Sequence, residues 1–126
     1  MAKPGAKIGK KASDLTNLTT TASGLKYVDN VVGTGAQPSA TSRVTVHYTG
    51  TNATTGEQFD SSVDRGQPIE FAMNGVIKGF SEGLSTMKVG GKRTVLIPAA
   101  LGYGPYQQGL AQTGDIIFDI ELIAVK

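Results

Sequence analysis

The sequence predicts an α+β domain in which one twisted antiparallel β-sheet wraps around a single short α-helix. Three observations favour this fold class. Segments with strand-like alternation recur from residue 24 onward, and many of the seventeen glycines lie between them. Only one segment has helical spacing, and it is short. A chain of 126 residues with 39% apolar residues suffices for one domain with one core.

Six segments have the residue pattern of strands. In one of them Val44, Val46 and Tyr48 alternate with polar residues, so one face of that strand is apolar. The last segment alternates in the same way through Phe118 and Ile120. The predicted strands span residues 25–32, 43–50, 57–59, 69–72, 92–97 and 115–125.

The predicted helix has apolar residues three or four positions apart, namely Ile77, Phe80, Leu84 and Met87. Asn74 is a candidate N-cap, and Gly90 with Gly91 is expected to stop the helix. Gly79 and Gly83 weaken a helix by about 1 kcal/mol each relative to alanine. Packing against the sheet is therefore expected to hold this helix in place.

Residues 1–23 are predicted to be a flexible basic extension, and residues 24–126 the folded domain. The first eleven residues hold four lysines and no acidic residue, whereas the rest of the chain has eight basic and ten acidic residues. The low-complexity run TNLTTTAS follows the lysines. No apolar stretch typical of a secretory leader accompanies them. A cytoplasmic location is expected, with a secreted or periplasmic one as the alternative if a leader has been removed.

The composition excludes several classes of site. The chain has no cysteine, which excludes disulfides, thiolate zinc sites and a cysteine nucleophile. A single histidine excludes a two-histidine zinc site, so no metal site is expected. The apolar runs are too short to span a membrane. Because the excess basic charge lies on the extension, no nucleic-acid partner is expected.

Two residues are candidates for other chemistry and are interpreted as structural. Residues 79–83 (GFSEG) match a hydrolase nucleophile motif, but Ser81 lies inside the predicted helix and the histidine precedes it. His47 alternates with the apolar side chains of its strand, so it is expected to point away from the apolar face.

Large aromatic residues are spread across the predicted strands, helix and loops, where they would serve as core in any domain of this size. Their sequence context is more specific. Five short segments resemble, in order and spacing, the FKBP-type peptidyl-prolyl cis-trans isomerases: residues 46–50 (VHYTG), 59–62 (FDSS), 76–80 (VIKGF), 101–104 (LGYG) and 117–122 (IFDIEL). The resemblance covers residues 24–126.

The resemblance implies an apolar pocket between helix and sheet that takes a proline ring. The wall, entrance and floor positions of that pocket correspond to Tyr48, Phe59, Val76, Ile77, Phe80 and Phe118. Ile69 stands at a further wall position where the family often has an aromatic residue. Phe80 stands where many members have tryptophan. Leu110, in a loop that lacks the usual Ile-Pro-Pro pattern, is expected to contact the residue before proline and to favour Leu or Phe there.

The resemblance also assigns catalytic roles. The Ile77 N–H would hold a substrate carbonyl, and the Tyr103 hydroxyl would bind a second one. Asp60 would lie at the pocket edge, oriented by Tyr48 and Arg65. The residues expected to carry catalysis are thus Tyr48, Asp60, Ile77, Tyr103 and Phe118.

The implied function is acceleration of X–Pro bond rotation in protein substrates by a non-covalent mechanism, with assistance to protein folding. No cofactor is expected, because rotation breaks no covalent bond. The expected partners are proline-containing polypeptides and the macrolide inhibitors tacrolimus and rapamycin, and the expected state is a monomer. The alternative is a non-catalytic proline-binding or chaperone module with the same fold.

Overall fold

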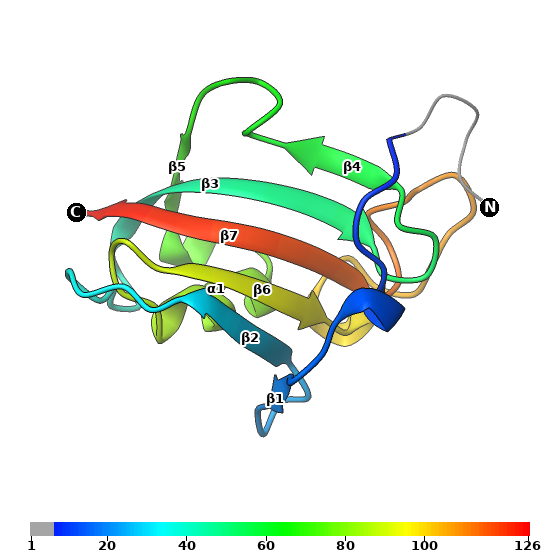
Figure 1. The fold of residues 1–126 in the computed structure, drawn as a ribbon, viewed down its shortest axis with the longest axis horizontal. Coiled ribbons are helices and arrows are strands. Elements are labelled where there is room, and N and C mark those ends of the chain that lie inside the picture. The colour runs from blue at the N-terminus through cyan, green and yellow to red at the C-terminus, as the bar shows by residue number, and fades with distance from the viewer. Residues whose placement is uncertain (1–6) are drawn as a thin grey trace.

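One antiparallel sheet forms most of the computed structural model, which describes residues 7–126, and a short helix packs against one of its faces (Figure 1). The strands run in the order β1-β2-β6-β7-β3-β4, and β5 also pairs with β3. Their bounds are β1 Thr19–Thr20, β2 Lys26–Val31, β3 Arg43–Asn52, β4 Gln58–Ser61, β5 Ile69–Ala72, β6 Lys92–Ile97 and β7 Ile116–Val125. This arrangement confirms the predicted fold class.

The two longest strands, β3 and β7, lie side by side in the middle of the sheet (Figure 1). Val46 pairs with Leu122 and Tyr48 with Ile120, so apolar side chains of both strands point to the same face. These residues are buried, and that face forms the core. The alternation in the sequence therefore identifies the buried face.

Helix α1 (Lys78–Ser85) begins and ends at different residues from those expected. Its N-cap is Ile77, because Asn74 lies in a preceding 3-10 turn, η2 (Met73–Gly75), and does not cap α1. The helix ends at Ser85, before the two glycines that were expected to stop it. Gln37 donates a hydrogen bond to the Ser85 carbonyl at 2.8 Å, which satisfies one of the carbonyl groups left free at this end.

The glycines of α1 allow the helix to lie close to β6. A Cβ atom at Gly79 would lie 2.4 Å from Cγ2 of Ile97, and one at Gly83 would lie 2.9 Å from Cγ1 of Val95. Their helix propensity is poor, but larger residues would push α1 away from the sheet. Buried Arg93 strengthens this contact by donating a hydrogen bond to the Gly83 carbonyl at 2.8 Å.

Residues 7–12, part of the predicted extension, cross the end of β3 and the start of β4 (Figure 1). The Gly9 N–H donates to the Gly56 carbonyl at 2.7 Å, and Lys10 forms an ion pair with Asp119 at 2.9 Å. The segment continues through the 3-10 turn η1 (Ala12–Asp14) into β1, which the sequence did not indicate. Its flexibility and the boundary at residue 24 stay predictions. Lys3 lies outside the described residues.

The connection from β6 to β7 contains the 3-10 turn η3 (Ala99–Leu101) and a closed loop. The Gly114 N–H donates to the Gly104 carbonyl at 2.8 Å, which joins the two ends of the loop. Both glycines have positive φ angles, of 86° and 78°, a conformation that favours glycine. No helix within residues 7–126 is long and apolar enough to cross a membrane.

Candidate active site

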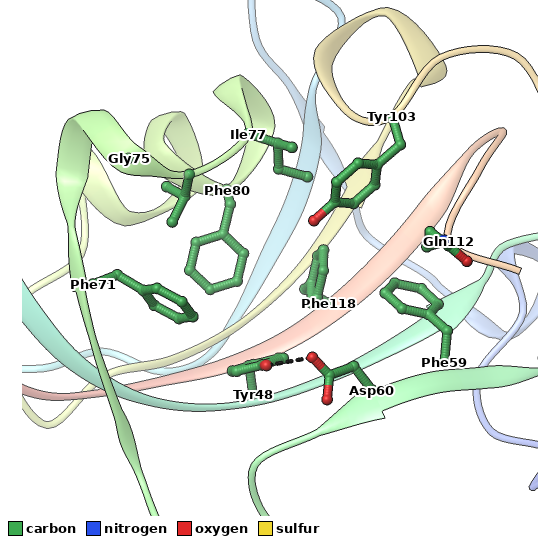
Figure 2. Close-up of a pocket in the computed structure, with 11 residues that line it drawn as sticks. Tyr48, Phe59, Asp60, Phe71, Gly75, Ile77, Phe80, Tyr103, Gln112 and Phe118 are labelled. Atoms are coloured by element: carbon green, nitrogen blue, oxygen red, sulfur yellow. Dashed lines mark hydrogen bonds between the residues drawn. The ribbon is translucent and has the colours of Figure 1, made fainter. Parts of the chain in front are cut away.

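A pocket of about 540 Å³ opens between α1 and the face of the sheet that α1 covers (Figure 2). Strands β3, β4, β5 and β7 and helix α1 contribute to it, together with the connection from β5 to α1 and the connection from β6 to β7. The residues that line the pocket are Tyr48, Phe59, Asp60, Phe71, Gly75, Val76, Ile77, Phe80, Tyr103, Gln112 and Phe118.

Aromatic rings form the walls and floor of this pocket. Phe80 of α1 and Phe118 of β7 meet edge to face, with ring centroids 5.0 Å apart. Tyr48 of β3 meets Phe118 at 5.8 Å, and Phe59 of β4 meets it from the other side at 5.6 Å. The rings therefore enclose an apolar space whose shape is fixed by their mutual contacts.

Gly50 makes the approach of two of these rings possible. It pairs with Phe118 across β3 and β7. A Cβ atom at this position would lie 2.6 Å from Cζ of Phe59 and 2.7 Å from Cε1 of Phe118. Any larger residue would displace the aromatic walls, so the glycine that ends the VHYTG segment is required by packing.

One edge of the pocket carries a charged hydrogen-bond network. The Tyr48 hydroxyl donates to Asp60 at 2.5 Å, and Arg65 forms an ion pair with Asp60 and donates to the Tyr48 hydroxyl oxygen at 3.1 Å. Burial and the hydrogen bond to Asp60 raise the pKa of Tyr48. Burial alone would raise the pKa of Asp60, but hydrogen bonds from Tyr48 and Arg65 outweigh it and lower that pKa. Asp60 is therefore an anion with two fixed donors.

Two further residues that line the pocket, on the side opposite Asp60, carry hydrogen-bond donors. The Ile77 N–H, just before α1, makes no hydrogen bond within residues 7–126. The Tyr103 side chain is half exposed and its hydroxyl points toward the rings (Figure 2). The pocket thus combines an apolar floor with two donors that a carbonyl oxygen could reach.

A family model described as FKBP-type peptidyl-prolyl cis-trans isomerase matches residues 34–123, which include all the residues that line this pocket. The chain belongs to this isomerase family. The resemblance in the sequence motifs is thereby confirmed.

Named relatives agree with the FKBP assignment. The chain is 47% identical over 108 residues to the FKBP-type isomerase FkpA of Aeromonas hydrophila, covering 85% of this chain and 40% of FkpA. It is 46% identical over 97 residues to a probable FK506-binding protein of Corynebacterium glutamicum, covering 76% of this chain and 82% of that protein. The chain therefore spans less than half the length of the Aeromonas FkpA.

Solved FKBP structures share the fold. The crystal structure of FkpA from Escherichia coli superposes with a TM-score of 0.81 at 37% identity, covering 90% of this chain and 54% of that one. A peptidyl-prolyl cis-trans isomerase from Pseudomonas syringae pv. tomato gives a TM-score of 0.77 at 32% identity, with 91% and 85% covered.

Eight of the eleven residues expected at the FKBP site line the pocket: Tyr48, Phe59, Asp60, Val76, Ile77, Phe80, Tyr103 and Phe118. Arg65 does not line it but reaches it through Asp60 and Tyr48. Their assigned roles stay predictions.

Ile69 and Leu110 do not line the pocket. Ile69 packs on the edge of the core from β5, two residues before Phe71, which supplies the pocket wall. Leu110 is 41% exposed near the tip of the closed loop. The short loop brings Gln112, rather than Leu110, to the pocket.

Sequence reasoning missed three residues that line the pocket, namely Phe71, Gly75 and Gln112. Phe71 was recoverable, because residues two apart on a strand share a face and Ile69 had been assigned to this wall. Gln112 had no such signal, because the loop departs from the family pattern and its conformation depends on contacts with distant residues.

His47 lies on the other face of the sheet from Tyr48, as expected. It lines a separate pocket of about 250 Å³ together with Lys10, Lys92 and Glu121. Its Nδ1 lies 2.9 Å from Oγ of Ser62. The histidine therefore has no contact with the aromatic pocket.

Proposed function

We propose that the aromatic pocket binds the proline of an X–Pro segment and accelerates its cis-trans isomerisation. The observation that supports the proposal is an apolar space lined by aromatic rings, with a charged hydrogen-bond network at one edge. Membership of the FKBP-type family supports it. The pocket has the mixed apolar and polar lining that is typical of small-ligand sites.

The reaction requires rotation about a tertiary amide, against a barrier of about 18–20 kcal/mol. Resonance in the planar amide places negative charge on its oxygen. Aromatic walls solvate this charge poorly, so moving the amide from water into the pocket disfavours the planar form relative to the twisted form. A differential stabilisation of about 7–8 kcal/mol corresponds to a rate increase of about five to six decades.

Fixed polar groups add to this effect. The Ile77 N–H would hold one main-chain carbonyl, so that the substrate on that side of the rotating bond stays fixed while the other side turns. The Tyr103 hydroxyl would bind a second carbonyl. Asp60 would face the partly positive amide atoms as rotation proceeds. The two donors that hold Asp60 fix its charge in place, which avoids reorganisation during the reaction.

A protease-coupled isomerisation assay tests this function. Chymotrypsin cleaves only the trans form of a suitable X–Pro–Phe peptide, so an active isomerase speeds the slow phase in proportion to its concentration. The unsubstituted protein should do this, and Phe118→Ala should not at the same concentration. A folded, unsubstituted protein that binds the peptide without speeding the slow phase would instead be the non-catalytic module.

We also propose that tacrolimus or rapamycin occupies this pocket and that the isomerase assists protein folding. The similarity to a probable FK506-binding protein supports the first part. A saturating dose of tacrolimus should abolish the acceleration of the slow phase. The isomerase should also speed refolding of a proline-limited protein, and tacrolimus should remove that effect.

A further inference from the structure

Gln112 places an unpartnered amide in the aromatic pocket. Its side chain is half-buried and lies beside Phe59 (Figure 2). Within residues 7–126, no hydrogen bond forms to either atom of this amide. A primary amide offers one carbonyl acceptor and two N–H donors. The pocket thus has a polar side chain available to a ligand.

The fold holds Gln112 in this position from both sides. The buried side chain of Asn52, at the end of β3, donates from Nδ2 to the Ala111 carbonyl at 3.1 Å and to the Thr113 carbonyl at 3.2 Å. The Thr113 hydroxyl donates to the Leu110 carbonyl at 2.7 Å. Ala111 and Thr113 are themselves buried. The residues flanking Gln112 are therefore fixed to the sheet, and its side chain is directed to the pocket.

The other polar groups of the pocket either have partners within the protein or are the donors proposed for substrate carbonyls. The Ile77 N–H can only donate, and a Tyr103 hydroxyl that binds a carbonyl also acts as a donor. Asp60 already accepts from Tyr48 and Arg65. A polypeptide in the pocket brings main-chain N–H groups as well as carbonyls, and a buried N–H without a partner is costly. The Oε1 atom of Gln112 can satisfy one of them.

The position of Gln112 indicates which N–H this is. Proline has no N–H, so the nearest ones belong to the residue before it, X, and the residue after it. Ile77 lies near the start of α1, whereas Gln112 lies beside Phe59, with Tyr103 between them in this view (Figure 2). If the proline carbonyl binds at Ile77, the chain after proline stays on that side. The N–H of X then lies toward Gln112.

We propose that Oε1 of Gln112 accepts a hydrogen bond from the main-chain N–H of the residue before proline. This inference rests on the proposed function and adds a binding group to it. Because every residue except proline has this N–H, the contact would promote binding of X–Pro segments whatever the side chain of X.

Depsipeptide substrates test the proposal, with isomerisation followed by NMR exchange so that no protease is needed. One peptide replaces the N–H of X with an ester oxygen, and another replaces the N–H after proline. Gln112→Met keeps the length of the side chain but removes the acceptor. It should lower kcat/KM on the all-amide peptide about fivefold, the effect of one ordinary hydrogen bond.

The decisive result is the lack of additivity. The ester at X should lower kcat/KM of the unsubstituted protein by the same factor, and it should lower that of Gln112→Met no further. The ester after proline should affect both proteins equally. Gln108→Met, an exposed glutamine in the same loop, is the matched control and should behave as the unsubstituted protein. Circular dichroism checks the fold of each variant.

Three outcomes would overturn the proposal. In the first, the loss caused by the ester at X and the loss caused by Gln112→Met multiply when they are combined. In the second, Gln112→Met has no effect on the all-amide peptide. In the third, its loss appears only when X has a polar side chain. If Gln112→Met does not fold, the comparison of the two esters on the unsubstituted protein still decides which N–H is bound. No turnover of any peptide by the unsubstituted protein would reject the proposed function instead.

Discussion

Tyr48 links the apolar and the polar parts of the pocket, because its ring belongs to the wall and its hydroxyl donates to Asp60. The pKa of Tyr48 is raised by burial and that of Asp60 is lowered by its donors, so both move away from neutrality. Each group therefore keeps one protonation state over the range in which the isomerase would act.

A flat pH profile is expected from these two residues. Isomerase activity should change little between about pH 6 and 9, because neither Tyr48 nor Asp60 titrates there. The measurement is kcat/KM across this range in buffers of constant ionic strength. A bell-shaped profile that His47→Gln abolishes would contradict the assignment, since His47 lies on the other face of the sheet.

Asp60 should also make the stability of the protein depend on pH in the acid range. Its pKa is lower in the folded state than in the unfolded chain. Its contribution to stability is therefore present above about pH 4, the ordinary value for aspartate, and is lost as the pH falls through the folded value. Urea unfolding should show that Asp60→Asn is less stable than the unsubstituted protein at about pH 6 and that the difference shrinks at about pH 3. A constant difference would mean that Asp60 acts by packing alone.

Phe118 should be the most sensitive wall residue. It contacts Tyr48, Phe59 and Phe80 through ring edges and faces, so Phe118→Ala opens the pocket to water. We expect kcat/KM to fall at least about tenfold and stability to fall by about 3–5 kcal/mol. Activity must be compared at a temperature where circular dichroism shows the variant to be folded. Unchanged turnover in that state would reject this wall assignment.

At the scale of elements, α1 depends on its fit to β6 more than on its intrinsic propensity. Gly79→Ala would improve helix propensity by about 1 kcal/mol. The added methyl group would nevertheless meet Ile97, so a net loss of about 1–3 kcal/mol in stability is expected from overpacking. Chemical denaturation measures this loss.

Two variants serve as controls for the α1 substitution. Ser81→Ala adds an alanine to the same helix at a half-buried position and should leave stability within about 0.5 kcal/mol. Ile97→Ala removes the atoms that a Gly79 methyl group would meet, so its cost should be smaller in the Gly79→Ala background than alone. Strict additivity of the two costs would contradict the proposed clash.

The N-terminal segment is the second element whose contacts have a measurable effect. Gly9, Lys10 and Ala12 bond to the end of β3 and the turn that follows it. Deleting residues 1–14 should lower the free energy of unfolding by about 1–3 kcal/mol, since the lost hydrogen bonds are partly offset by the entropy released. Activity of the folded protein should not change. Deletion of residues 1–6 is the control, and equal stability of the two deletions would contradict the expectation.

For the whole molecule, alternation and spacing were sufficient to predict the sheet and the position of the helix. Val46 and Tyr48 are buried as their pattern indicates, and the stripe containing Phe80 and Leu84 faces the sheet. The local pattern of apolar residues was enough to predict the buried faces, because the spacing of these residues within one strand or helix shows which side of it is apolar.

Features set by contacts between distant segments could not be predicted in this way. The carbonyl of Ser85, at the end of α1, accepts a hydrogen bond from Gln37, which lies 48 positions earlier in the sequence. The position of Gln112 depends on Asn52, which fixes the loop from another strand. Neither hydrogen-bonded pairing can be recognised from the neighbouring residues in the sequence, so the tertiary structure was needed to find them.

The central position of β7 has a consequence for how the chain folds. Strand β7 (Ile116–Val125) lies between β3 and β6, although it is made after all other strands. A nascent chain on the ribosome therefore lacks the partner that joins β3 to β6 until nearly the whole domain has been synthesised. Pairing of segments so distant in sequence also slows folding. Folding of this domain should accordingly be a late event, completed after β7 leaves the ribosome.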